Sequence, residues 1–529
     1  MKIRNFLCLF LAVLAFAACD SLEDTYKDAA GDGPIRYLGK CSDLNATIGW
    51  KRLMVTWTNS PDPVVDKVKL TWTKDDDTKE AILDKNVNSY EIDDLDDGNY
   101  EVTVCSIDKE GRPSLATTVY ARPYTEKHEV VQSFTQIVSN HYFFKNHLVL
   151  FFLGWEDNIE NAYMTYHSKD GKECRLELTP KLVNSLHYLV PEEIDETKPV
   201  LIYREGRIAY CQDLITFSPV SLDNNVLFNS DFKQEMKRQY GFMDDIPEQW
   251  VNSTTALEYD RNIGSFTDLL NFPNLKTLRL GKNRFVRREM VDDADVAQSK
   301  VYDTESSEFV LKVIHQLTPD FTVERYDKHF STLAKASYIK EMGQPTEPQH
   351  TYLDLKGLKF TSDPEDKGYN SYLENLTDGN DNTFWEPGGK AALTTYTLDL
   401  DLKKEQVMHG VRLAQTFYEH ENKRNWCPNL VKIFVSEDGE DWHSATYIEE
   451  LEIGNSTGEI VYIPFISGGV KGRYLRIVTS TPYSSSTFNV SLAEVVSWWL
   501  VSLLIVFKKH SLCKNTIFNG NAVAVYALF

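Results

Sequence analysis

Several common chemistries are missing from the sequence as motifs. None of the eight cysteines forms a C-x-x-C pair, so a zinc site is not indicated. Cys41 with Cys105 and Cys174 with Cys211 could each close a loop within one domain, or all could stay free thiols. The patterns H-E-x-x-H and G-x-G-x-x-G and the phosphate-binding P-loop do not occur. A glycosidase carboxylate pair could be hidden among the many acids, but no segment resembles a catalytic domain, so we expect no enzyme.

Basic residues are in the minority. The chain has 56 Lys and Arg against 78 Asp and Glu, and its formal net charge is −22. Such a surface repels phosphate backbones, so nucleic acid is not an expected partner. With 42% hydrophobic residues the chain is too apolar for disorder, and its long apolar runs lie only at the two ends, which excludes a multi-spanning membrane protein. A length of 529 residues predicts about three to five domains.

The first apolar run has the layout of a secretory signal. Two basic residues precede an apolar core at 6–16, and two alanines stand directly before Cys19. This end resembles the bacterial lipobox, with Phe16 in place of the usual Leu. The resemblance implies that residues 1–18 are removed and that Cys19 is acylated, which anchors the protein to a membrane without a spanning helix. Ordinary secretion, with Cys19 near the cleavage site by chance, is the alternative.

Residues 19–34 follow as an acidic tether. This segment resembles the acidic signal that sends Bacteroidetes lipoproteins to the cell surface. The resemblance implies a protein of the outer membrane that is lipid-anchored and faces the cell exterior.

Residues 35–123 and 124–218 are predicted to form two Ig-like β-sandwiches. Short segments with period-2 alternation are separated by Asp, Gly and Pro turns. Trp57 is expected in the first core, and the sequence around Tyr100 resembles the fibronectin type III pattern, which makes Tyr100 a tyrosine corner. The second copy repeats these segments, with Trp155 in the place of Trp57. Such modules commonly serve as stiff spacers.

The segment 219–345 changes to a helical period. Residues 229–240 and 306–317 are predicted to be amphipathic helices, the second behind a Ser cap. Between them, L-x-Y-x-x-N at 257–262 recurs as L-x-L-x-x-N at 278–283, which matches the leucine-rich-repeat template. Two repeats cannot bury a continuous core, so this α/β connector is expected to pack on a neighbour. A concave partner-binding face is the functional alternative.

A basic cluster follows the second repeat. In a chain this acidic, we expect the cluster to pair with another domain and not with nucleic acid. Its members are Lys282, Arg284, Arg287 and Arg288.

Residues 346–497 contain a series of ordered motifs. The first, at 375–385, has the form D-G-x-x-x-T-x-W. The second is a hairpin with Asp-Gly turn chemistry and Trp442 as a core residue. Residues 472–477 and 490–494 supply closing strands. Together these motifs resemble the discoidin, or coagulation factor 5/8 type C, family, whose fold is a jelly-roll sandwich.

The resemblance also implies a structural Ca²⁺. A tight Asp-Gly turn directs carbonyls and carboxylates to one point, and calcium takes about six to eight oxygen ligands. The bacterial members place a last ligand, a Glu, in the final strand. The expected side-chain ligands are Asp378, Asp381, Thr383 and Glu494. A turn held by hydrogen bonds alone is the alternative.

Sugar recognition needs an aromatic face and a few polar groups. In related bacterial modules these groups come from loops at one end of the sandwich. The loop 416–426 has this composition, and 483–488 offers a second aromatic loop. The candidate ligand-binding residues are Tyr418, His420, Arg424, Asn425, Trp426 and Phe488.

Residues 498–529 do not fit this architecture. The apolar run 495–507 is too short for a comfortable transmembrane helix, and 495–498 are expected to be the last strand. The remaining tail is basic, whereas the rest of the chain is acidic. An altered reading frame or read-through is our preferred explanation, and a membrane-proximal element is the alternative.

The sequence therefore predicts a mainly β, multidomain protein with two Ig-like β-sandwiches, a small α/β leucine-rich-like connector and a C-terminal discoidin jelly-roll β-sandwich. The architecture resembles Bacteroidetes outer-membrane lipoproteins encoded with glycan-uptake systems. This resemblance implies non-catalytic glycan binding, accessory to polysaccharide capture and uptake, with an outer-membrane glycan transporter as a partner. The alternatives are an adhesin that binds host or cell-surface protein and a polysaccharide-degrading enzyme with an unrecognised site.

Overall fold

The computed structural model describes most of the chain between residues 37 and 499. The described ranges are 37–132, 136–208, 211–243, 245–287, 298–365, 372–417, 426–454, 456–482 and 488–499. Among the helices in these ranges, none combines the length and the apolar character that a membrane crossing requires. The chain divides into two compact units, 1–225 and 226–529. Strands dominate both, which confirms the predicted mainly β class.

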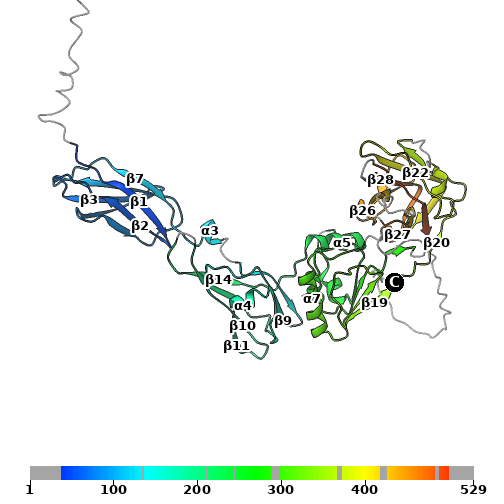
Figure 1. Cartoon of the computed structure of the whole chain (residues 1–529), viewed down its shortest axis with the longest axis horizontal. Coiled ribbons are helices and arrows are strands. Elements are labelled where there is room, and N and C mark those ends of the chain that lie inside the picture. Colours follow the sequence, from blue (N-terminus) through cyan, green and yellow to red (C-terminus); the bar gives the residue numbers. More distant parts are fainter. Residues whose placement is uncertain are drawn as a thin grey trace, which may run out of the picture. The chain divides into compact units, whose positions relative to one another are not determined.

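The first unit contains two sandwiches with the same topology (Figure 1). The first has strands β1 (Ser42–Gly49), β2 (Arg52–Thr58), β3 (Lys67–Lys74), β4 (Asp77–Asp84), β5 (Ser89–Ile92), β6 (Tyr100–Ile107) and β7 (Thr117–Ala121). The second has β8 (Val138–Phe144), β9 (His147–Phe152), β10 (Ile159–His167), β11 (Glu173–Glu177), β12 (His187–Leu189), β13 (Leu201–Gly206) and β14 (Ile215–Ser221), with short helices α3 (Glu129–Gln132) and α4 (Pro180–Val183). The sheet orders β1-β2-β5 and β4-β3-β6-β7 recur as β12-β9-β8 and β11-β10-β13-β14.

Alternation along the strands builds the first core. Leu53, Val55 and Trp57 on β2 are buried, whereas the residues between them are more exposed. The Tyr100 hydroxyl donates to the Asp96 carbonyl at 3.3 Å, which is the tyrosine-corner bond. The predicted roles of Trp57 and Tyr100 are therefore confirmed.

The second sandwich departs from its predicted pattern at two places. Trp155 does not take the place of Trp57, because β9 ends at Phe152 and Trp155 only packs partly buried against the core. The module also continues past the predicted boundary at 218. Strand β14 runs to Ser221, and buried Leu222 bonds to the Val200 carbonyl.

The two sandwiches are joined by a charged pair and a small apolar cluster. The Arg52 guanidinium donates to both carboxylate oxygens of Asp213, at 3.1 and 2.6 Å, and the Trp50 amide donates to the same carboxylate. Tyr124, Ile208 and other apolar side chains pack beside this pair. Side-chain contacts therefore join the two sandwiches, in addition to the chain that links them. The cysteines in the described ranges are free thiols.

The second unit begins with the connector. Its elements are α5 (Ser230–Tyr240), α6 (Glu248–Ser253), β15 (Ala256–Tyr259), η1 (Thr267–Asn271), β16 (Thr277–Leu280), β17 (Phe285–Val286), α7 (Thr304–Leu317), β18 (Thr322–Tyr326) and β19 (Ile339–Gly343). Strands β15, β16, β18 and β19 form a parallel sheet in that order. The repeated positions lie side by side, with Leu257 opposite Leu278 and Tyr259 opposite Leu280.

Both predicted helices are present in the connector. Helix α5 begins at Ser230, one residue after the predicted start, and ends at Tyr240 as predicted. Helix α7 begins earlier than expected, at Thr304, and the predicted Ser cap at Ser306 is wrong. The cap is Asp303, whose carboxylate accepts the Ser306 amide at 3.1 Å.

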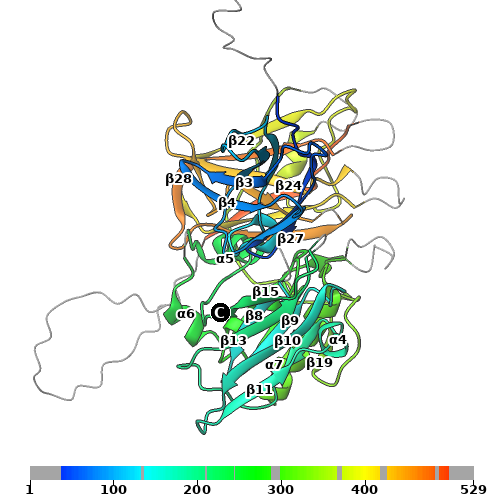
Figure 2. The same ribbon diagram turned by 90° about the vertical axis from the view of Figure 1, so that its left-hand side faces the viewer.

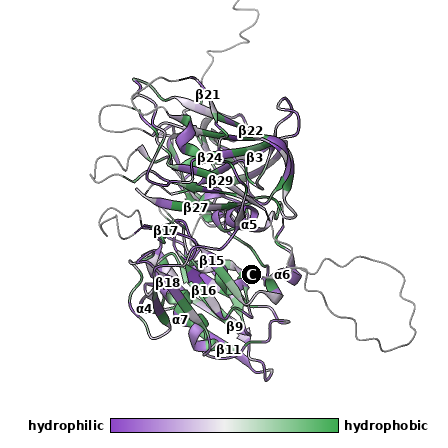
Figure 3. Ribbon diagram, turned by 90° about the vertical axis from the view of Figure 1, so that its right-hand side faces the viewer, coloured by the Kyte–Doolittle hydropathy of each residue, from purple (hydrophilic) through white to green (hydrophobic). Residues whose placement is uncertain are grey.

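The C-terminal sandwich consists of two antiparallel sheets. Its strands are β20 (Thr351–Tyr352), β21 (Thr361–Asp363), β22 (Thr395–Met408), β23 (Gly410–Ala414), β24 (Leu430–Ser436), β25 (His443–Ser444), β26 (Glu450–Glu452), β27 (Glu459–Pro464), β28 (Val470–Ser480) and β29 (Glu494–Trp499), with the short helix η3 (Leu373–Leu376). One sheet has the order β21-β22-β28-β24-β25, with β26 beside β24, and the other β17-β27-β23-β29-β20. Hydrophobic and hydrophilic residues alternate along these strands (Figure 3).

One of the two motif tryptophans of this sandwich differs from prediction. Trp385 is fully buried, but Trp442 is not a core residue. Its indole bonds to the Gly439 carbonyl, and the Arg476 guanidinium lies 3.8 Å from its ring, which leaves it half-buried outside the core. The predicted end of the domain at 497 is also too early, since Trp498 is buried and stacks on His350.

A strand of the connector completes the C-terminal sandwich. The connector strand β17 pairs antiparallel with β27, placing Phe285 opposite Ile460 and Val286 opposite Glu459. Helix α5 lies on the side of the connector near β27 (Figure 2). The connector and the sandwich therefore share one sheet.

A buried ion pair accompanies this strand pairing. The Arg284 guanidinium donates to both oxygens of Glu459, at 2.5 and 2.8 Å, and Arg261 donates to one at 3.2 Å. Burial alone would raise the pKa of Glu459, but the two guanidinium groups outweigh it and lower the pKa to about 2. Arg284 thus has the interdomain role predicted for the basic cluster.

The other members of the cluster have separate positions. Arg287 contacts the loop at Asp381 and Asn382 of the sandwich, again as predicted. Lys282 binds Glu258 within the connector, which is not the predicted interdomain contact. Arg288 lies outside the described residues.

The substitution Glu459→Gln tests the ion pair. It leaves two buried guanidinium groups without their carboxylate, so the free energy of unfolding at pH 7 should fall by about 3–5 kcal/mol. Because the folded pKa is lowered, the carboxylate stabilises the wild-type fold above its usual pKa near 4.5, and this contribution is lost as the pH falls toward about 2. Urea unfolding across this pH range should show a smaller acid loss in the variant.

The control is Asp320→Asn, which removes the exposed partner of Lys276. This change should cost less than about 1 kcal/mol at pH 7. Equal losses of unfolding free energy in the two variants would contradict the conclusion that the buried ion pair of Glu459 stabilises the fold.

Candidate functional site

The predicted metal ligands lie on and beside the loop 378–383, here named the cation loop. Gly379, with a φ of +79°, turns the chain so that its amide donates to Glu494 Oε2 at 3.1 Å. The Thr383 hydroxyl donates to Asp378 Oδ2 at 2.8 Å. Asp378, Thr383 and Glu494 are therefore brought together, although Glu494 is 111 residues beyond Thr383 in the sequence.

Asp381 is placed differently. Its two carboxylate oxygens accept a bidentate pair of hydrogen bonds from Arg412 on β23, at 2.8 and 2.6 Å. Burial alone would raise the pKa of Asp381, but Arg412 outweighs burial and lowers it. Among the four predicted ligands, Asp381 thus has a guanidinium partner for its side chain. Its main-chain carbonyl accepts from Arg287 of the connector at 3.2 Å.

Glu494 has the opposite electrostatics. It is only 4% exposed, and burial raises its pKa to about 8, with the nearby charges of Asp378 and Asp381 acting in the same direction. At neutral pH the carboxyl is therefore mostly protonated when no cation is bound. A cation beside it would reverse this preference.

A cavity of about 750 Å³ opens beside the cation loop. Its wall includes Glu347, Tyr462 and Arg412 as well as the loop itself. The wall combines the carboxylates of Asp378 and Glu494, which are hard oxygen ligands of the kind that calcium prefers, with the basic side chains of Arg287, Lys356 and Arg412. Within the described ranges, no group of three or more His, Cys, Asp and Glu side chains is arranged as a metal site. Asp378, Thr383 and Glu494 carry hard oxygen atoms of the kind that calcium takes, and hydrogen bonds of the loop bring these residues together.

The predicted ligand-binding residues fall into two sets. Trp426 and Phe488 are described and half-buried, and they lie in the connections before β24 and before β29. The Trp426 carbonyl accepts the Ser491 amide at 3.0 Å, and Phe488 forms a β-bridge with Lys390. The other predicted residues lie outside the described residues; they are Tyr418, His420, Arg424 and Asn425.

The sequence reasoning did not place two arginines, Arg412 and Arg287, at the cation loop. Arg412 interrupts the apolar strand β23, which is the one signal that could have singled it out. Arg287 belonged to the recognised basic cluster, but its contact with the cation loop spans 94 residues and leaves no local pattern.

Residues 454–458 fit the G-x-S-x-G pattern of serine hydrolases. In those enzymes the serine stands exposed on a turn from a strand to a helix. Here Ser456 is fully buried in a turn between the strands β26 and β27. This setting does not fit a nucleophile.

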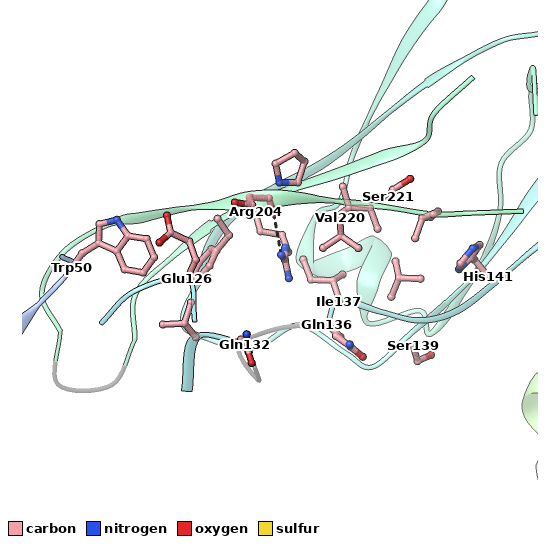
Figure 4. Close-up of a pocket in the computed structure, with 17 residues that line it drawn as sticks. Trp50, Glu126, Gln132, Gln136, Ile137, Ser139, His141, Arg204, Val220 and Ser221 are labelled. Carbon is pink, nitrogen blue, oxygen red and sulfur yellow. Dashed lines mark hydrogen bonds between the residues drawn. The ribbon is translucent and has the colours of Figure 1, made fainter. Parts of the chain in front are cut away.

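A further cavity, of about 460 Å³, lies in the first unit (Figure 4). Arg204 on β13 points into it, and its guanidinium donates to the Ser218 carbonyl at 3.3 Å. Burial lowers the pKa of this guanidinium. No predicted site residue lines this cavity.

Comparison with known proteins identifies the C-terminal sandwich. Residues 359–495 match the F5/8 type C domain family, so this part of the chain is a discoidin domain. Residues 19–199 match DUF4998, a domain of unknown function. No curated protein matches the chain.

Solved structures similar to parts of the chain include two bacterial modules. One is CBM32-3 from a family 31 glycoside hydrolase of Clostridium perfringens, with 22% identity over 28% of this chain and 94% of that one, at a TM-score of 0.23. Another is the C-terminal domain of a chitobiase from Bacteroides fragilis, with 22% identity over 28% and 95% of the two chains, at a TM-score of 0.22. A two-domain fibronectin type III segment of chicken tenascin shares 12% identity over 35% and 97%, at a TM-score of 0.17.

Proposed function

We propose that this protein is a non-catalytic cell-surface lipoprotein that binds glycans through its discoidin domain and so assists polysaccharide capture and uptake. The observation that carries the proposal is the family match of residues 359–495, in the same sandwich that holds the aromatic candidates: the Trp426 carbonyl accepts the amide of Ser491, three residues after Phe488. An aromatic face packs on the apolar side of a sugar ring, and polar groups beside it bind the hydroxyls. Both candidates are half-buried, so each has a fixed position and an accessible part.

The first unit supports a spacer role in this function. Its two sandwiches repeat one topology, and Arg52, Asp213 and an apolar cluster join them. Such a tandem holds a binding domain away from the membrane without itself binding a ligand. An outer-membrane glycan transporter is the proposed recipient of the captured polysaccharide.

The substitution Trp426→Ala tests the glycan site. A glycan array probed with the full chain identifies a ligand, and isothermal titration measures its affinity. Loss of the indole should weaken binding by about tenfold, because an aromatic contact contributes on the order of 1 kcal/mol.

The matched control is Trp499→Ala, which removes an exposed tryptophan at the C-terminal end of β29. Its affinity should equal that of the wild type. Binding to protein ligands that survives deglycosylation would favour an adhesin, and release of reducing ends from a polysaccharide would favour an enzyme.

We also propose that Ca²⁺ binds at the cation loop through Asp378, Thr383 and Glu494. A bound Ca²⁺ supplies the positive charge that allows the buried Glu494 to ionise. The remaining ligands are main-chain oxygens. The Asp381 carboxylate is not among the ligands, because both of its oxygens accept hydrogen bonds from Arg412. Arg287 holds the same loop from the connector side.

Calcium binding is tested by unfolding and titration of the chain with and without Glu494→Gln. In EDTA, stability should fall as the pH rises from about 4.5 to about 8, because the unfolded chain ionises Glu494 before the folded one. Calcium at 100 times its dissociation constant should raise the Tm near pH 8 by about 5 °C, and the variant should not respond.

Asp438→Asn, in the other Asp-Gly turn of the domain, is the control and should bind calcium like the wild type. A wild-type chain that shows no heat of calcium binding would refute the site. Equal binding by Glu494→Gln would remove Glu494 from it.

The lipid anchor at Cys19 lies outside the described residues and rests on the sequence alone. In a Bacteroidetes host, Cys19→Ala should abolish palmitate labelling and release the protein from the membrane fraction. Cys8→Ala, inside the segment predicted to be removed, should change neither. Labelling that persists without Cys19 would leave ordinary secretion as the better explanation.

A further inference from the structure

One face of a discoidin sheet forms the floor of the cavity beside the cation loop. Arg412 on β23 lies directly opposite Tyr462 on β27 and Val496 on β29. Their neighbours along the strands, Leu413 and Val495 among them, are buried in the core. Because successive side chains of a strand point to opposite faces, Tyr462, Arg412 and Val496 form one half-buried row on the other face, and all three line the cavity.

Part of the cavity wall comes from residues outside the family match, which begins at residue 359. Most residues of the segment 347–356 line the cavity, and the strand β20 of this segment pairs with β29. Arg287, which follows the connector strand β17, also lines the cavity and donates to Asn382 of the cation loop at 3.2 Å. The connector and the segment before the match therefore complete a cavity that the matched residues form only in part.

Aromatic rings make up one portion of this wall. His350 stacks on the buried Trp498, with ring centroids 4.3 Å apart, and its ring lies 5.5 Å from that of Tyr462. The Phe285 ring of the connector packs edge-on against Tyr462 at 5.3 Å. Tyr352 lies beside His350 and is 37% exposed, so its ring has packed neighbours and an accessible part. Such a ring can pack on the apolar side of a sugar.

Hydrogen bonds hold the polar groups of the cavity in one network. The Tyr462 hydroxyl donates to Glu347 Oε2 at 2.7 Å and lies 3.1 Å from the Tyr352 hydroxyl. Arg412 donates to both oxygens of Asp381, and its Nε lies 3.8 Å from Glu347 Oε2. Each carboxylate of this network thus lies beside a guanidinium group, which disfavours recognition of a ligand by a single full charge. Sugar hydroxyls both donate and accept, so they match a wall that offers donors beside acceptors.

We propose that this cavity is a second glycan-binding site, which takes a neutral oligosaccharide beside the Tyr352 ring. Its volume of about 750 Å³ lies inside the range of about 300–1,000 Å³ that small-molecule sites occupy. The inference extends the proposed function to a second place on the chain and rests on it for the class of ligand. The proposed calcium ligands are not among the sugar-binding residues, which are Tyr352, Tyr462, Glu347 and Arg412.

The test is isothermal titration of the full chain in a buffer with calcium. The probe is whichever of cellotetraose, xylotetraose and N-acetylchitotetraose the wild type binds most tightly, and tetragalacturonate is the acidic comparison. Trp426→Ala weakens the first site, so further substitutions in that variant report on the cavity. The control substitution is Tyr302→Ala, which removes an exposed tyrosine of the connector that does not line the cavity.

The wild type should bind two equivalents of the probe. In the Trp426→Ala chain, adding Tyr352→Ala should weaken binding at the cavity by about tenfold, whereas adding Tyr302→Ala should change it by less than about twofold. Tyr352→Phe keeps the ring and should weaken binding by less than about threefold. Glu347→Gln keeps the size of the side chain and is the second variant if the alanine lowers the Tm; it should weaken binding by about threefold.

A single site in the wild type that is weakened by Trp426→Ala and not by Tyr352→Ala overturns the second site and leaves the proposed function standing. Binding that is weakened by Tyr352→Ala and not by Trp426→Ala supports the cavity and refutes the assignment of Trp426. Failure of all three neutral probes overturns the inference, and so does binding of tetragalacturonate alone.

Discussion

The architecture of the second unit depends on one buried carboxylate. Glu459 stands at the start of β27 and bonds to Arg284 and Arg261 from the connector. Removing such charges from water is costly, and their attraction compensates only when the geometry is good. The contribution of this ion pair is therefore chiefly one of specificity. It fixes β17 opposite residues 459–460, and a slip by one residue would turn Phe285 and Val286 to the wrong faces.

The acids of this unit show how local surroundings decide the charge of a carboxyl group. Glu459 is fully buried and Asp381 half-buried, but each faces a guanidinium group, and both have lowered pKa values. Glu494 is buried beside two other carboxylates and has a raised pKa. The charges beside each carboxyl group, and not burial alone, therefore decide the direction in which its pKa shifts.

The sequence predicted correctly those features of the fold that depend on short-range residue patterns. The alternation around Trp57, the tyrosine corner at Tyr100 and the in-register repeat at Leu257 and Leu278 are short-range patterns, and all three are present. The helix cap at 303–306 was misplaced because Asp and Ser are both good caps, and only the observed bond decides between them. Trp442 was misplaced because a motif fixes its sequence position and not the side of the sheet on which its ring lies.

The other strands of the connector were not predicted from the sequence for a different reason. Strand β18 continues the repeat of β16, but Arg325 occupies the position that pairs with Leu280. This buried arginine donates to the carbonyls of Phe330 and Leu333 and to Glu341. A guanidinium with such partners can replace a leucine in the core, yet no leucine template recognises it. The strand β17 is harder still, because two residues carry no period and its partners are about 175 positions away.

These long-range contacts extend the discoidin sandwich beyond the residues that match the family. The family match covers residues 359–495, whereas the sandwich takes strands from β17 and β20 and the buried Trp498 as well. The connector belongs to the same folded body, because β17 pairs with β27 and the Arg284 guanidinium holds Glu459 at the start of that strand. The folded unit is consequently larger than the unit of sequence similarity, and its boundary is set by the partners of the Glu459 carboxylate.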